Sequence, residues 1–180
     1  SDVIVIGASG AMGSATTYYL AKRGLNVTGI DRFPAGHDRG SSHGETRLIR
    51  QAYFEDSRYV PMLKRAYELW DDLDNETGQR LRHENGLVIY GNSDDTQRLT
   101  QMRESSAKYD IPLEELSGDA CRERFPLFRA PEGYIGLYEP TGGYLEVEKC
   151  VERFATLADR TGARFVVGDA VSSWSAPDQN

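Results

Sequence analysis

Hydrophobic positions at the start of the chain predict a strand, a helix and a second strand in succession. Val3–Ile6 is a continuous apolar run rich in β-branched residues, which is typical of a strand buried on both faces of a parallel sheet. The pattern predicts a helix over Ala11–Lys22, ended by Gly24, and a strand over residues 25–30. This βαβ order predicts a parallel pair with a right-handed crossover.

The rest of the chain alternates between loop, helix and strand patterns. Residues 32–44 hold Pro34 and several glycines among polar residues, which indicates a long loop. Ser57 is expected to cap a helix whose apolar stripe faces the core and consists of Tyr59, Met62, Leu63, Ala66, Leu69, Trp70 and Leu73. Strands are predicted at 86–90, 134–138 and 164–167, and helices at 94–109, 117–125 (capped by Ser117) and around 147–157 (ended by Gly162).

This order of elements predicts an α/β fold that is interrupted by a mixed α+β segment. We expect a first segment at 1–84, an inserted segment at 85–144 and a return to the first domain at 145–180. The chain begins at Ser1 and ends with residues 176–180 directly after a strand-like stretch, so we expect it to be a fragment of a longer protein.

Composition narrows the function classes. With 180 residues, 39% of them hydrophobic, the chain is long enough to bury a sizeable core. Its net charge of −7 disfavours binding to nucleic acid or to an anionic membrane surface, and no apolar run is long enough to span a bilayer. Cys121 and Cys150 stand alone, which suggests neither a metal site nor a disulfide. We expect a cytoplasmic protein.

A glycine-rich turn follows the first strand and predicts a nucleotide site. Gly7, Gly10 and Gly13 have GxxGxxG spacing, which allows a tight turn, close approach of a pyrophosphate and close packing of the helix. Asp31, at the end of the second strand, is placed to accept a hydrogen bond from a ribose hydroxyl. The spacing leaves FAD and NAD(P) open, because short-chain reductases share it; a turn without any ligand is a further alternative.

A longer motif lies at residues 40–53, GSSHGETRLIRQAY, and is followed by Tyr59-Val60-Pro61 and Glu68-Leu69-Trp70. It closely resembles the monomeric sarcosine oxidase family, which includes N-methyltryptophan oxidase and peroxisomal sarcosine/pipecolate oxidase. The resemblance runs from Asp2 to about Val171. It implies a Rossmann-like FAD-binding domain of the glutathione-reductase type, at 1–84 and 145–180, interleaved with a substrate domain built on an antiparallel sheet, at 85–144.

The resemblance also implies an activity and a set of site residues. FAD would take a hydride from the carbon beside a secondary amine of a small amino acid (sarcosine, N-methyl or pipecolate type), and oxygen would become hydrogen peroxide. His43 and Arg47 would act catalytically beside the flavin, and Arg50 would bind the substrate carboxylate. The remaining cofactor contacts would come from Gly7, Gly10, Ala11, Met12, Gly13, Asp31, Arg32, Ser41, Ser42, Thr46 and Val171.

Departures from the family pattern keep alternatives open. The glycine turn is one residue longer than the family's, at Ser9 or its neighbour. The chain ends where family members are about half complete, before the cysteine that bonds the flavin and the lysine linked to oxygen activation. We therefore expect the chain alone to be inactive, and a non-catalytic nucleotide-binding module is an alternative. His43 also fits a loop histidine, and Arg47 and Arg50 fit surface arginines on one helical turn.

Overall fold

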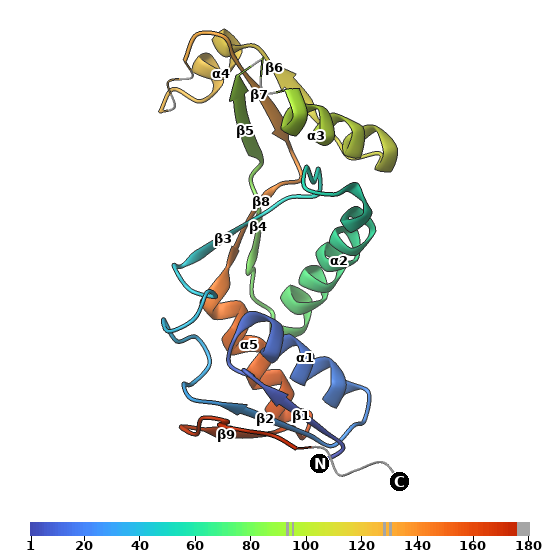
Figure 1. Cartoon of the computed structure of the whole chain (residues 1–180), viewed down its shortest axis with the longest axis vertical. Helices are drawn as coiled ribbons and strands as arrows, with labels where there is room; N and C mark the ends of the chain where they lie inside the picture. Colours follow the sequence, from blue (N-terminus) through green and yellow to red (C-terminus); the bar gives the residue numbers. More distant parts are fainter. Residues whose placement is uncertain (93, 95, 128, 130, 176–180) are drawn as a thin grey trace. The chain divides into compact units, whose positions relative to one another are not determined.

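The computed structural model describes residues 1–92, 94, 96–127, 129 and 131–175 (Figure 1). These residues fall into two compact units, one formed by residues 1–47 and 146–180 and the other by residues 48–145. Residues 176–180, at the end of the segment predicted at 145–180, lie outside the described residues. Asp95, in the helix predicted at 94–109, also lies outside them. Each unit is described by itself below.

The first unit is a parallel sheet with two helices. The strand order is β1–β2–β9, and both pairings are parallel, with Val3 opposite Val27 and Gly29 opposite Phe165. The helices α1 and α5 lie beside each other along this sheet (Figure 1). The elements are β1 (Val3–Ile6), α1 (Ala11–Lys22), β2 (Val27–Asp31), α5 (Val147–Arg160) and β9 (Arg164–Val167). The predicted parallel βαβ unit is confirmed.

Aromatic side chains join the two helices of the first unit. The ring of Phe154 in α5 lies 5.7 Å from that of Tyr18 and 6.0 Å from that of Tyr19, both in α1. Such tilted ring pairs combine buried apolar area with favourable quadrupole geometry. After α1 the chain turns at Gly24, whose φ of +83° is the left-handed conformation expected of a residue following a helix.

One prediction for the first strand is wrong. Ile4 and Ile6 are 60% and 59% exposed, so β1 is buried on one face instead of two. The opposite face, which holds Val5, is the one covered by the helices. The second strand is also shifted from the predicted residues 25–30, because Leu25 and Asn26 belong to the turn that precedes Val27.

The second unit contains two small sheets and three helices within its described residues. In the sheet β5–β7–β6 both pairings are antiparallel, with Val88 opposite Tyr138 and Leu116 opposite Gly136. The other sheet has the order β3–β8–β4. The elements are β3 (Thr46–Ile49), α2 (Val60–Thr77), β4 (Arg82–Glu84), β5 (Leu87–Asn92), α3 (Thr96–Tyr109), β6 (Glu114–Leu116), α4 (Gly118–Arg124), β7 (Tyr134–Glu139) and β8 (Gly143–Glu146).

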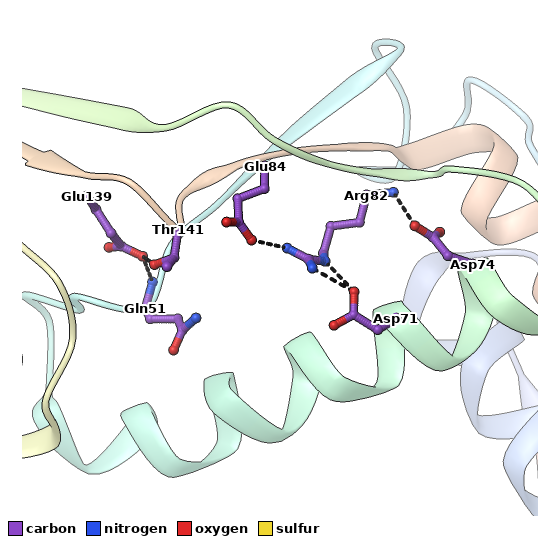
Figure 2. Close-up of polar contacts among 7 residues, drawn as sticks. All are labelled: Gln51, Asp71, Asp74, Arg82, Glu84, Glu139 and Thr141. Carbon is purple, nitrogen blue, oxygen red and sulfur yellow. Dashed lines mark hydrogen bonds and ion pairs between the residues drawn. The ribbon is translucent and has the colours of Figure 1, made fainter.

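Polar contacts link α2 to β4 in this unit (Figure 2). The Arg82 guanidinium lies 2.6 Å from a carboxylate oxygen of Asp71 in α2 and 3.0 Å from one of Glu84. The Asp74 carboxylate accepts a hydrogen bond from the backbone N–H of Leu81 at 2.9 Å. Helix and strand are therefore held together by charge-assisted hydrogen bonds at the start of β4.

The start of α2 differs from the prediction. A 3₁₀ turn, η1 (Ser57–Tyr59), precedes the α-helix, and the Asp56 side chain caps this turn by accepting a hydrogen bond from the Arg58 N–H. The α-helix itself begins after Tyr59 and has no side-chain cap. Of the predicted apolar stripe, Tyr59 and Met62 are exposed and Leu73 is buried, and Val60 and Tyr67, which lie outside the predicted stripe, are also buried.

The compact units divide the chain differently from the predicted segments 1–84, 85–144 and 145–180. Residues 48–84, including α2, belong to the second compact unit with residues 85–145. The core explains this grouping, because Ala52 and Val60 pack with Leu99, Met102 and Leu137 in one cluster. The assignment of segments to FAD or substrate binding stays a prediction.

Candidate functional site

The glycine turn between β1 and α1 requires glycine at positions 7 and 13 for different reasons. Gly7 has a φ of +81°, a conformation that other residues rarely adopt. A Cβ atom on Gly13 would lie 2.0 Å from the carbonyl oxygen of Gly7, so the helix packs directly on the turn. Gly10 differs, since a Cβ there would lie 3.6 Å from the same oxygen, at ordinary contact distance. Gly10 thus exposes backbone at the start of α1.

Asp31 links the end of β2 to this turn. One carboxylate oxygen accepts from the backbone N–H of Ser9 at 2.9 Å, and the other accepts from the N–H of Phe33 at 3.1 Å. Each carboxylate oxygen has a second lone pair, so Asp31 retains acceptors for a ribose hydroxyl.

Two cavities lie at the ends of β1 and β2. One, of about 410 Å³, is lined by the predicted residues Gly7, Gly10, Asp31, Arg32, Ser41 and Ser42. The other, of about 290 Å³, shares Gly7, Asp31 and Arg32 and extends to Val171. The carboxyl ends of parallel strands are the usual position of a dinucleotide. Both cavities lie at this edge of the sheet, and the contacts of phosphates with the glycine turn and of adenine with Val171 stay predictions.

The loop from Ser41 to Arg47 is held against both helices of the first unit. The Ser42 hydroxyl accepts a hydrogen bond from the N–H of Ala11 at 3.1 Å, and the Arg47 guanidinium donates to the Ser41 carbonyl oxygen. The Glu148 carboxylate, in the first turn of α5, accepts from the N–H groups of Gly44 at 2.6 Å and Glu45 at 3.1 Å.

The contacts of Glu148 favour its charged form. Burial raises its pKa, but hydrogen bonds from the N–H groups of Glu45, Glu148 and Gly44, together with the charge of His43, outweigh burial and lower the pKa below the usual value of 4.5. The carboxylate therefore stays charged and keeps the loop in place at neutral pH.

Several predicted site residues are exposed. His43, Thr46 and Arg47 are exposed in the loop and in β3, and Met12 at the start of α1 is 84% exposed. Residues 46–49 form a strand, so the alternative that Arg47 and Arg50 share a face of a helical turn is wrong. The catalytic roles of His43 and Arg47 stay predictions.

Arg50 belongs to the second unit and has a defined environment there. Its Nη2 atom lies 2.7 Å and 3.0 Å from the two carboxylate oxygens of Glu55. The guanidinium carbon lies 4.8 Å from the ring centre of Tyr53 and 4.6 Å from that of Phe54. The Nε atom of Arg50 is buried and has no hydrogen-bond partner within the described part of the chain. Arg50 thus already binds one carboxylate and retains an unused donor.

Several residues around the two cavities were not predicted for the site, among them Ser9, His37 and Arg39. Ser9 binds Asp31 through its backbone, and His37 and Arg39 line the larger cavity. The ring of His37 lies 5.2 Å from that of Phe33, and its Nδ1 accepts from the Arg39 N–H at 2.9 Å. The only signal in the sequence was their position, with His37 and Arg39 in the polar loop after Asp31 and Ser9 in the glycine turn.

Tyr18 and Lys22 in α1 have the Tyr-x-x-x-Lys spacing of the proton-relay pair in short-chain reductases, and Lys22 Nζ lies 2.7 Å from the Tyr18 hydroxyl. Tyr18 is, however, only 2% exposed and packs against Phe154. Neither residue is among the described residues that line the two cavities. The pair is part of the helix packing and gives the reductase alternative no support.

The sequence model of the FAD dependent oxidoreductase family, DAO, matches residues 2–179. The chain belongs to this family. The choice that the glycine spacing left open is therefore settled in favour of FAD, as predicted, and the Rossmann-like FAD-binding fold is confirmed by the solved structures that the chain resembles.

Curated relatives of this DAO family chain include the N-methyl-L-tryptophan oxidase of Yersinia pestis (strain Pestoides F), with 42% identity over 172 residues. That match covers 96% of this chain and 46% of the relative, so the chain spans about half the length of the curated relatives it matches. The predicted resemblance to the family that includes N-methyltryptophan oxidase is thereby confirmed.

Two solved structures are similar in both fold and sequence. NikD, described as an unusual amino acid oxidase essential for nikkomycin biosynthesis, is 27% identical with a TM-score of 0.80, and the match covers 93% of this chain and 43% of NikD. The L-proline dehydrogenase from P. horikoshii is also 27% identical, with a TM-score of 0.79, and the match covers 93% of this chain and 44% of the dehydrogenase.

None of the helices in the described ranges is long and apolar enough to cross a membrane.

Proposed function

We propose that this chain supplies the dinucleotide site and a substrate-carboxylate site of an FAD-dependent oxidase that acts on secondary amino acids. The observation that carries the proposal is the pair of cavities around Asp31, whose linings include the predicted residues Gly7, Gly10, Arg32, Ser42 and Val171. The 42% identity to an N-methyl-L-tryptophan oxidase supports the substrate class.

The residues of the first unit fit the cofactor. Gly10 leaves the start of α1 open, and the first turn of α1 holds no acidic residue, so the positive end of the helix dipole suits a pyrophosphate. Asp31 would accept from the adenosine ribose, and Val171 would border the adenine. Bound FAD would supply the hydride acceptor.

Arg50 fits the substrate. The Nη2 atom of Arg50 contacts both carboxylate oxygens of Glu55, which supports a role for this side chain in binding a carboxylate. The rings of Tyr53 and Phe54 lie against the guanidinium and limit its movement. A substrate carboxylate at Arg50 would orient the amine, while the positive charge of Arg47, with His43 beside the flavin as predicted, would favour a reduced, anionic cofactor.

The proposal is tested by oxygen consumption of the full-length protein with a panel of amines. N-methyl and cyclic secondary amino acids are expected to consume oxygen and release hydrogen peroxide, whereas primary amino acids are not. Arg50→Lys is expected to raise KM about 10-fold or more, because an ammonium group cannot replace a bidentate guanidinium. Oxidation of primary amino acids alone, or an unchanged KM in Arg50→Lys, would contradict the proposal.

The chain expressed without the rest of the protein is proposed to bind adenine nucleotide but not to oxidise amines. It contains the cavities at Asp31, yet it spans only 46% of the N-methyl-L-tryptophan oxidase it matches. Turnover by the isolated chain would contradict this part of the proposal.

A further inference from the structure

A buried carboxylate at the end of β7 binds the backbone directly after Arg50. Glu139 is only 1% exposed. Its Oε1 atom accepts from the N–H of Gln51 at 2.7 Å, and its Oε2 atom accepts from the N–H of Ala52 at 2.9 Å. The Thr141 hydroxyl donates to Oε1 at 3.1 Å (Figure 2). One carboxylate thus holds two successive backbone amides.

Burying a carboxylate is costly unless hydrogen bonds compensate for the lost water. Burial raises the pKa of Glu139, and the hydrogen bonds from Ala52, Gln51 and Thr141, with the charge of Arg50, act in the opposite direction. A well-packed apolar side chain is often at least as stabilising at a buried position. The particular contribution of Glu139 is therefore the fixed conformation that it gives to residues 51 and 52.

The same segment is held from its other side. The Ser105 hydroxyl, in α3, donates to the carbonyl oxygen of Tyr53 at 2.6 Å. Ala52 is fully buried in the core cluster that also contains Leu99 and Leu137. Residues 51–53 are therefore anchored by side chains from β7 and α3, and Arg50 stands at the start of this anchored segment.

We propose that Glu139 is a positioning residue for substrate binding: by fixing the amides of Gln51 and Ala52 it sets where the Arg50 guanidinium meets the substrate carboxylate. The inference rests on the proposed function, in which Arg50 binds that carboxylate. Glu139 itself touches neither substrate nor cofactor. Its effect passes through the backbone, and it is specific to substrates that carry a carboxylate.

Glu139→Gln in the full-length holoprotein tests this directly. The variant keeps the shape but replaces one acceptor oxygen by an NH₂ group, which faces a backbone N–H and cannot accept from it. With an N-methyl amino acid, KM is expected to rise about 10-fold while kcat changes less than about 2-fold. With the matching carboxamide, which lacks the charged carboxylate, kcat/KM is expected to stay unchanged.

Two further variants serve as controls. Glu115→Gln removes an exposed carboxylate from the same antiparallel sheet, where it pairs with Arg103 at 2.8 Å, and should leave both substrates unaffected. Thr141→Val removes only the hydroxyl that donates to Glu139 and should raise KM for the N-methyl amino acid about 2-fold to 3-fold. Thr141→Val also provides the test if Glu139→Gln does not fold.

Several results would overturn the inference. An unchanged KM in Glu139→Gln, or equal losses with both substrates, would leave Glu139 with a structural role only. A lowered KM would show that Glu139 acts merely by opposing the charge of Arg50. If the wild-type protein oxidises no amine, the proposed function fails. Amide hydrogen exchange at Gln51 and Ala52 then tests the role of Glu139 separately. Faster exchange in Glu139→Gln, but not in Glu115→Gln, shows that Glu139 holds these two amides even though the proposed function is wrong.

Discussion

The backbone N–H of Ser9 donates a hydrogen bond to the Asp31 carboxylate across 2.9 Å, which joins the glycine turn to the end of the neighbouring strand. Ser9 is almost fully buried in this turn. The hydrogen bond helps the turn to keep its shape, because a buried donor receives a charged acceptor. Asp31 therefore has both a structural contact and a predicted contact with ribose.

Asp31→Asn is expected to weaken FAD binding about 10-fold, because one charged acceptor is lost, at a cost of about 1.5 kcal/mol. FAD titration of the apoprotein, followed by flavin fluorescence, measures the change. Asp38→Asn is a matched control, since Asp38 is exposed on the same loop and pairs with Arg39. Equal affinities of wild type and Asp31→Asn would remove Asp31 from the cofactor site.

The glycines at positions 10 and 13 should give opposite phenotypes. Gly13→Ala places a Cβ 2.0 Å from the Gly7 carbonyl oxygen and should destabilise the fold by about 3 kcal/mol, the upper range for overpacking. Gly10→Ala places its Cβ 3.6 Å from that oxygen and should fold normally, yet bind FAD at least about 10-fold more weakly. Urea denaturation and FAD titration separate the two effects. A stable Gly13→Ala, or full affinity in Gly10→Ala, would contradict the geometry.

The lowered pKa of Glu148 leads us to expect that the stability of the fold depends on pH. Because its pKa is lowered in the folded state, the stabilisation is present above the usual value of 4.5 and is lost as the pH falls through the folded-state pKa. Glu148→Gln should therefore be less stable than wild type by about 1 kcal/mol at neutral pH, with a difference that shrinks below pH 4.5. Urea unfolding at a series of pH values checks this. A difference that grows toward low pH would have the wrong sign.

Two buried hydroxyls in the second unit should respond differently to removal. The Tyr67 hydroxyl is buried without a hydrogen-bond partner among the described residues. Burial is the largest of the effects that raise the pKa of Tyr67 above its usual value of 10.0. Tyr67→Phe should leave the free energy of unfolding unchanged or raise it by up to about 1 kcal/mol. Ser105→Ala removes the hydrogen bond to Tyr53 and should lower the free energy of unfolding by about 1 to 2 kcal/mol. The opposite ranking in urea denaturation would contradict the described contacts.

The parallel core of the first unit was predictable because its signals are local. The apolar run at Val3–Ile6, the glycines after it and Gly24 after the helix each determine a neighbouring element, and all three elements lie where they were expected, with the second strand shifted by one or two residues. Exposure was less predictable. Ile4 and Ile6 are apolar residues of the kind that is usually buried, but elements far away in the sequence determine which face of β1 is covered.

Short strands and the capped 3₁₀ turn before α2 were missed for a related reason. The strands Thr46–Ile49, Arg82–Glu84 and Glu114–Leu116 are too short and too polar to show alternation, so only their pairing partners define them. Asp56 and Ser57 are both good capping residues, and the 3₁₀ turn decides between them. The Glu139 anchor joins residues that are 88 and 87 positions apart, which no local pattern indicates.

We propose that this chain is part of an oxidase whose FAD is reduced by a secondary amino acid. The most direct test is the visible absorbance spectrum of the purified full-length protein, recorded without oxygen before and after addition of an N-methyl amino acid. We expect flavin bands that bleach on addition and return when air is admitted, with release of hydrogen peroxide. Flavin bands that stay unchanged with every secondary amino acid, or a colourless protein that binds NADPH, would contradict it.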